Sequence, residues 1–138
     1  MISPGRFFAV VIAASSLAGC ASLPGVCISP AQPMVSAEML FGRKIGDRVG
    51  VSDADFARFA AQEITPRFPD GLTIIDARGQ YRDTERARLI REPSKLVLLT
   101  FRDDPQKRVA LGEIAEAYKT TFKQQSVLTT VRQTCASF

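Results

Sequence analysis

The sequence contains no histidine and no tryptophan, and only three of its 138 residues are cysteine. Histidine is the commonest general base and the commonest neutral metal ligand in proteins. Its absence excludes Ser-His and Cys-His catalytic arrangements, and three cysteines alone offer no plausible set of zinc ligands. Glycine-rich phosphate-binding motifs of the GxGxxG and GxxxxGK[ST] types are also missing. We therefore expect no metal and no cofactor, and we favour a binding function over an enzymatic one.

The chain also has only a small excess of positive over negative charge. The chain has 18 basic and 14 acidic residues, which gives a formal net charge of +4. This excess is too small to indicate a nucleic-acid partner. Apolar residues make up 46% of the chain and charged residues 23%, which is typical of a globular protein of one domain.

The N-terminus has the pattern of an export signal. After Arg6, residues 7–19 are uncharged, mainly apolar and end in small residues, as in a signal peptide. This run is shorter than the roughly 18 apolar residues that a membrane-spanning helix needs. The tetrapeptide Leu-Ala-Gly-Cys that ends at Cys20 resembles the lipobox of bacterial lipoproteins, in which the cysteine thiol becomes joined to diacylglycerol. We predict a signal peptide over residues 1–19 and a lipid on Cys20; the alternative is an ordinary secretory signal.

Lipidation of Cys20 would anchor the protein to a membrane of the cell envelope, with its folded part in the periplasm. In lipoprotein families an aspartate after the cysteine commonly retains the protein at the inner membrane. Ala21 and Ser22 follow here, so the resemblance favours the outer membrane. Residues 20–36 are rich in proline, serine and alanine and almost free of charge, which predicts a tether. The folded domain is expected over residues 37–138.

Two cysteines remain when Cys20 is assigned to the lipid. Cys27 and Cys135 lie near the two ends of the expected domain, and an exported chain reaches an oxidising compartment. Chain ends in compact domains often lie close together. We expect one disulfide between them; the alternative is two free thiols.

Hydrophobic periodicity predicts an α+β fold. Ser52 followed by two aspartates is a typical helix start, and so is Asp104 followed by Pro105. The helices are expected at residues 53–64 and 105–123, and the strands at 37–44, 71–82, 95–101 and 126–132, with Pro93 interrupting an earlier strand piece at 89–90. The order βαββαβ is that of a ferredoxin-like fold, in which two helices cover one face of an antiparallel sheet and the other face stays open.

The second expected strand carries a polar stripe. Polar residues at every second position share one face of it: Asp76, Arg78, Gln80 and Arg82. Apolar residues alternate with them on the other face: Ile75, Ala77 and Tyr81. We expect the apolar set to face the helices and the polar set to lie on the open face, with Arg91 and Lys95 across the hairpin. Such a site would suit an anionic polymer or an envelope protein; the alternative is a solvated face with cross-strand ion pairs.

Four short segments together resemble the bacterial domain-of-unknown-function family 3574. They are TPRFPDGLT at 65–73, DARGQ at 76–80, REPSK at 91–95 and SVL at 126–128. The likeness runs from about residue 39 to residue 138. Members are typically small envelope proteins, often with a lipoprotein leader, and Cys135 near the C-terminus suits that pattern. The resemblance implies one fold and an envelope location, and it implies no activity.

Two functions follow from these observations. The first is a non-catalytic envelope lipoprotein that binds an anionic ligand, a partner protein or a second copy of itself through the open face, or that acts as an accessory subunit. The second is a small histidine-free enzyme that uses Asp76 or Glu92 as a base beside an arginine clamp. A buried carboxylate with a raised pKa would favour the enzyme, and an exposed Asp76 on a flat surface would count against it.

Overall fold

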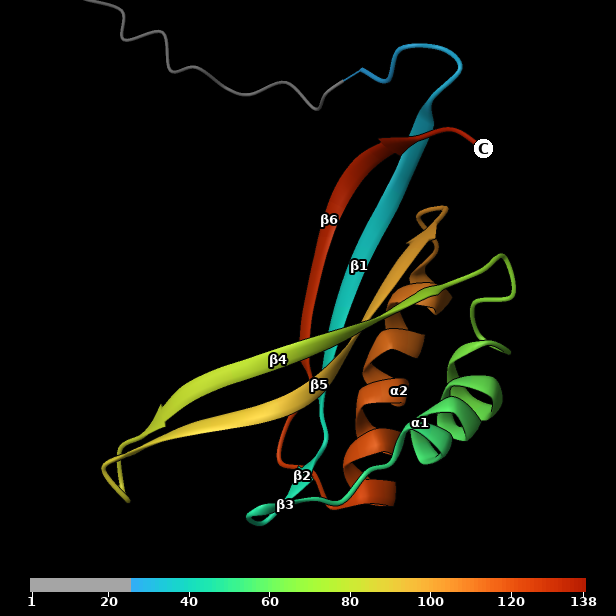
Figure 1. Cartoon of the computed structure of the whole chain (residues 1–138). Coiled ribbons are helices and arrows are strands. Elements are labelled where there is room, and N and C mark those ends of the chain that lie inside the picture. Colours follow the sequence, from blue (N-terminus) through green and yellow to red (C-terminus); the bar gives the residue numbers. More distant parts are fainter. Residues whose placement is uncertain (1–25) are drawn as a thin grey trace, which may run out of the picture.

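The structure, a computed structural model, describes residues 26–138, so the predicted signal peptide and Cys20 lie outside the described residues. Two helices cover one face of a four-stranded antiparallel sheet whose strand order is β4-β5-β1-β6 (Figure 1). The strands are β1 (Gln32–Gly42), β4 (Thr73–Asp83), β5 (Arg88–Phe101) and β6 (Leu128–Ala136). This arrangement confirms the predicted α+β, ferredoxin-like fold.

Both helices begin where the sequence predicts. In α1 (Asp53–Phe59) the Ser52 hydroxyl accepts a hydrogen bond from the backbone N–H of Asp55, whose carboxylate accepts one from the backbone N–H of Ser52. A π-helical turn, η1 (Ala60–Ile64), continues α1. In α2 (Pro105–Phe122) the Asp104 carboxylate accepts from the backbone N–H of Gln106 at 2.8 Å. These caps satisfy N–H groups that the first helical turn leaves unpaired.

The core lies between the helices and one face of the sheet. Alternate residues of β1 are buried there: Val35, Ala37, Met39 and Phe41. The ring of Phe41 lies 4.8 Å from that of Tyr118 on α2 and 5.3 Å from that of Phe56 on α1. Because these edge-on aromatic pairs join β1 to both helices, Phe41 marks which face of the sheet is covered. Val109 on α2 is 62% exposed and lies outside this core.

The sheet begins earlier than the sequence indicates. Residues 32–36 belong to β1, although they were expected in the tether, because β1 pairs with β6 from Gln32 opposite Ala136 onward. The disulfide between Cys27 and Cys135 joins the segment before β1 to the last strand. This confirms the predicted disulfide and explains why a proline-rich, uncharged segment is held against the sheet.

Pro93 does not interrupt β5, which runs as one strand from Arg88. Pairing between β1 and β5 ends at Gly42 opposite Ser94, and one further hydrogen bond follows, from the Arg43 N–H to the Pro93 carbonyl, so Pro93 lies at the end of this ladder. A proline is tolerated at such an edge because no ladder hydrogen bond is lost. Residues 78–93 of β4 and β5 therefore form a two-stranded arm that extends away from both helices (Figure 1).

Two further features complete the described part of the chain. A small hairpin of β2 (Lys44–Ile45) and β3 (Arg48–Val49) follows β1. Among residues 26–138, no helix is both long enough and apolar enough to cross a membrane.

Candidate functional site

The polar stripe of β4 lies on the helix side of the sheet, so the predicted assignment of its two faces is wrong. Asp76 stands opposite Lys95, and Lys95 stands opposite Phe41, which packs on both helices. Residues directly opposite one another on paired strands share a face. The helix side therefore carries Asp76, Arg78, Gln80 and Arg82. The open side carries Ile75, Ala77 and Tyr81.

Lys95 explains why an aspartate is tolerated on the helix side. Its ammonium group lies 2.6 Å from the Asp53 carboxylate and also contacts that of Asp76. The Arg43 guanidinium lies 3.1 Å from the same Asp53 carboxylate. The hydrogen bonds that Lys95 donates to Asp53 and Asp76 raise the pKa of Lys95, and the bond to Asp53 lowers the pKa of that carboxyl group. Two nearly buried cations are thus balanced by two exposed carboxylates, and this cluster holds the start of α1 against the sheet.

The remaining predicted residues lie together on the helix side of the arm. We call Arg78, Gln80, Arg82 and Arg91 the arginine face. The Nε atom of Arg91 donates a hydrogen bond to Oε1 of Gln80 at 2.8 Å. Within residues 26–138, none of the three arginines forms an ion pair. The structure thus brings four of the six predicted site residues together, and it places Asp76 and Lys95 in the separate cluster at the base of the arm.

The open face of the sheet holds a cavity of about 660 Å³. Its floor is formed where β1, β4 and β5 meet at the base of the arm, and its walls are the β2–β3 hairpin and the turn between α2 and β6. A volume of this size lies within the range of small-molecule sites, about 300–1,000 Å³. Among the residues of this open-face cavity are Gly42, Gly79, Tyr81, Glu92, Ser94 and Leu128.

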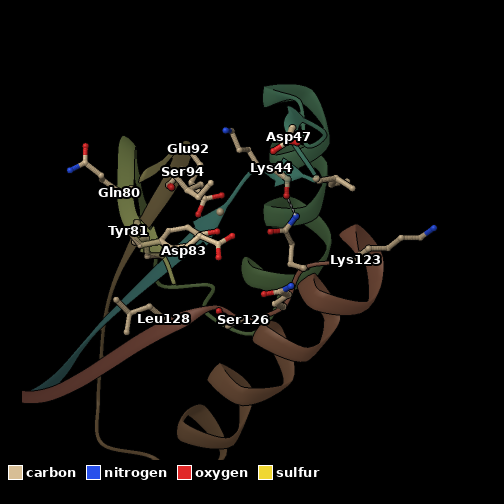
Figure 2. Close-up of a pocket in the computed structure, with 18 of the residues that line it drawn as sticks. Lys44, Asp47, Gln80, Tyr81, Asp83, Glu92, Ser94, Lys123, Ser126 and Leu128 are labelled. Carbon is tan, nitrogen blue, oxygen red and sulfur yellow. Dashed lines mark hydrogen bonds between the residues drawn. The ribbon is translucent and has the colours of Figure 1, made fainter. Parts of the chain in front are cut away.

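Two glycines make room for the polar floor of the cavity. A side-chain carbon on Gly42 would lie 3.1 Å from both carboxylate oxygens of Glu92, and one on Gly79 would lie 3.4 Å from the Ser94 hydroxyl. The Glu92 carboxylate therefore occupies the space that a side chain on Gly42 would fill. Figure 2 shows Glu92 and Ser94 beside each other on the floor of the cavity.

Helix α2 holds both the floor and one wall in place. The Tyr118 hydroxyl donates to the Gly42 carbonyl at 2.8 Å, and the Gln124 side-chain amide donates to the Lys44 carbonyl at 2.7 Å. Burial raises the pKa of the Tyr118 phenol, so the phenol remains a donor at neutral pH. These bonds fix the end of β1 and the β2–β3 hairpin relative to Glu92.

The other carboxylates around the cavity already have partners. Arg88 donates to Asp47 and lowers its pKa, and Asp83 accepts from the backbone N–H of Arg86 at 3.0 Å. Glu92 forms no ion pair within the described part of the chain. In Figure 2 the amino group of Lys123 points away from the other labelled residues. Glu92 is thus the carboxylate that a ligand could engage.

The residues from 26 to 138 contain no group of three or more Cys, Asp or Glu side chains placed to hold a metal ion.

The sequence pointed to Glu92 as an isolated candidate base, and it did not predict the cavity. The floor joins residues from three strands, and their proximity depends on a register that the sequence does not specify. The only hint of the cavity in the sequence is the pair Gly42 and Gly79, because a glycine inside a strand often marks a close approach of another group.

The solved structures of similar fold include two of a phage SAM lyase. A phage SAM lyase in complex with S-methyl-5'-thioadenosine is 16% identical with a TM-score of 0.60, and the match covers 85% of this chain and 97% of that chain. A phage SAM lyase in the apo state is 19% identical with a TM-score of 0.57, covering 72% and 79%. At these identities the likeness shows the fold alone.

Comparison with curated proteins finds no significant match. The protein-family comparison matches residues 36–138 to the family described as protein of unknown function, DUF3574. This match covers most of the chain and confirms the resemblance found in the sequence. The chain therefore belongs to the DUF3574 family.

Proposed function

We propose that this chain is a membrane-anchored envelope lipoprotein that binds a small organic ligand in the open-face cavity, as a binding module and not as an enzyme. The observation that carries the proposal is the Glu92 carboxylate. It lies over Gly42 in a cavity of about 660 Å³ and has no ion-pair partner among residues 26–138. A ligand that donates hydrogen bonds would pair with this carboxylate.

The lining of the cavity indicates the kind of ligand. The apolar side chains that line the cavity include Leu40, Ile90 and Leu128, and Tyr81 is also one of the lining residues. Glu92 and Ser94 add an acceptor and a hydroxyl on the floor. This combination suits a molecule with one flat or apolar part and one part rich in hydrogen-bond donors, such as a nucleoside derivative. S-methyl-5'-thioadenosine, which the similar phage lyase binds, is a reasonable first probe.

An enzyme remains the second candidate because the fold resembles that of a phage SAM lyase over 85% of this chain. The arrangement expected from the sequence is not the one present, however. Asp76 has an 82% exposed side chain and is paired with Lys95, which argues against it as the general base. Arg91 and Glu92 are neighbours on one strand and therefore point to opposite faces, so no clamp of arginines from the arginine face adjoins Glu92. Binding is the better-supported function.

Calorimetric titration tests the binding proposal. We expect the protein to bind S-methyl-5'-thioadenosine, and we expect Glu92→Gln to weaken binding about tenfold or more, since it removes a charge-assisted hydrogen bond. Glu116→Gln is the matched control, because Glu116 pairs with Lys119 on α2 and is not part of the cavity. Equal affinity in the two variants, or no binding by the wild type, would contradict the proposal. Consumption of SAM by the protein would favour the enzyme instead.

Metabolic labelling with radioactive palmitate tests the anchor. The wild type should carry label and Cys20→Ser should carry none. Ala21→Asp should keep the label but move the protein from the outer to the inner membrane, as the lipoprotein resemblance implies. Label on Cys20→Ser would show that the lipid, if any, is attached elsewhere.

A further inference from the structure

We infer that the arginine face is a second binding site, which holds the phosphate groups of an anionic membrane surface. Arg78, Arg82 and Arg91 are all exposed, and none of them forms an ion pair within residues 26–138. Gln80 lies among them and is neutral. The nearest carboxylate in the register of this face, Asp76, is engaged by Lys95. The face therefore carries uncompensated positive charge.

The three arginines lie close together on the arm. Arg78 and Arg82 flank Gln80 on β4, and Arg91 stands opposite Gln80 on β5. Residues two apart on a strand are separated by about 7 Å, and paired strands by about 5 Å. Each guanidinium is a planar fork that can donate two parallel hydrogen bonds to a phosphate. Several headgroup phosphates of one surface can therefore be contacted together.

One exposed hydrophobic side chain favours a lipid surface over a soluble phosphate. Leu89 stands opposite Arg82 on the same face of the arm and is 48% exposed. Basic residues together with an exposed leucine are typical of segments that lie at a bilayer interface. The arm also extends away from both helices (Figure 1), so a broad surface can approach it.

The three arginines of this site do not line the open-face cavity, although Gln80 between them does. Either proposal can therefore fail without the other.

Vesicle flotation of the full chain tests the membrane proposal. The measured quantity is the ratio of affinities for vesicles that contain phosphatidylglycerol and for vesicles of phosphatidylcholine alone, so that any binding through the N-terminal segment contributes equally to both. We expect a wild-type ratio of about tenfold or more at low salt, since each arginine near an anionic surface adds to binding. The triple variant Arg78→Gln, Arg82→Gln, Arg91→Gln should bring the ratio close to one. Leu89→Gln should reduce affinity for the phosphatidylglycerol vesicles.

A control with the same loss of charge separates a specific site from net charge. Arg48→Gln, Arg102→Gln and Lys123→Asn change exposed cations outside the arginine face, and this variant should keep most of the wild-type ratio. An equal loss in both triple variants, or an unchanged ratio in the arm variant, would overturn the proposal. Full competition by inorganic phosphate at millimolar concentration would also overturn it, because it would indicate a site for a soluble ion.

Discussion

Tyr118 connects the covered face of the sheet to the open-face cavity. Its ring packs against Phe41 in the core, and its hydroxyl donates to the carbonyl of Gly42, above which the Glu92 carboxylate lies. One buried residue thus contributes to stability through its ring and to the geometry of the cavity through its hydroxyl.

The raised pKa of Tyr118 predicts a loss of stability in alkali. A group whose pKa is higher in the folded state stabilises the fold fully below its unfolded pKa, here about 10, and this contribution declines as the pH rises further. We expect the free energy of unfolding to fall between about pH 9 and about pH 11, and to fall less steeply in Tyr118→Phe. Urea denaturation at the two pH values measures the difference. Tyr81→Phe should behave as the wild type, and equal slopes in all three proteins would contradict the assignment.

Single residues could be predicted where their role is local. Ser52 and Asp104 were identified as helix caps because capping depends on neighbours two or three positions away. Glu92 and Ser94 could not be assigned to a cavity, because their neighbours Gly42 and Gly79 come from other strands. Contacts between residues distant in sequence depend on register, which a single sequence specifies weakly on an exposed arm.

At the level of elements, β4 shows why the face assignment failed. Ile74 and Ile75 are adjacent and 40% and 42% exposed, respectively, so the strand offers apolar residues to both faces. Strand patterns identify the buried face where one face is packed and the other is solvated. Much of β4 lies in the arm, beyond the helices, where neither face is buried. Asp76 can lie on the helix side because its carboxylate forms an ion pair with Lys95.

Helix α1 should depend measurably on its first residues. Ser52→Ala removes the side-chain bond to the backbone N–H of Asp55, and loss of such a cap typically costs about 1 kcal/mol of the free energy of unfolding. Chemical denaturation should show that decrease. Ser137→Ala, at the exposed C-terminus, should leave stability unchanged. A Ser52→Ala protein as stable as this control would show that the cap contributes little.

For the whole molecule, the disulfide joins the two ends of the described domain across a sequence separation of 108 residues. Cross-linking so long a loop reduces the entropy of the unfolded chain, which the chain-entropy model values at about 4–5 kcal/mol, with measured effects often smaller. Sequence reasoning predicted this bond from compartment and cysteine number, and it predicted the fold from the order of helices and strands. The disulfide and the fold could be predicted because the number of cysteines and the order of helices and strands can be read directly from the sequence.

Reduction should therefore destabilise the protein strongly. We expect dithiothreitol to lower the free energy of unfolding of the wild type by about 2–5 kcal/mol, as measured with urea. The double variant Cys27→Ser, Cys135→Ser should be destabilised already and should not respond to dithiothreitol. A wild type indifferent to the reductant would contradict a stabilising role for the bond.

The central claim is that the open-face cavity binds a ligand, and NMR titration tests it most directly. S-methyl-5'-thioadenosine is added to the isotope-labelled protein while the backbone amide signals are followed. We predict that the largest shifts fall on Gly42, Gly79, Glu92 and Ser94, and that they are much reduced in Glu92→Gln. Shifts centred on another surface, or no shifts at all, would contradict the account.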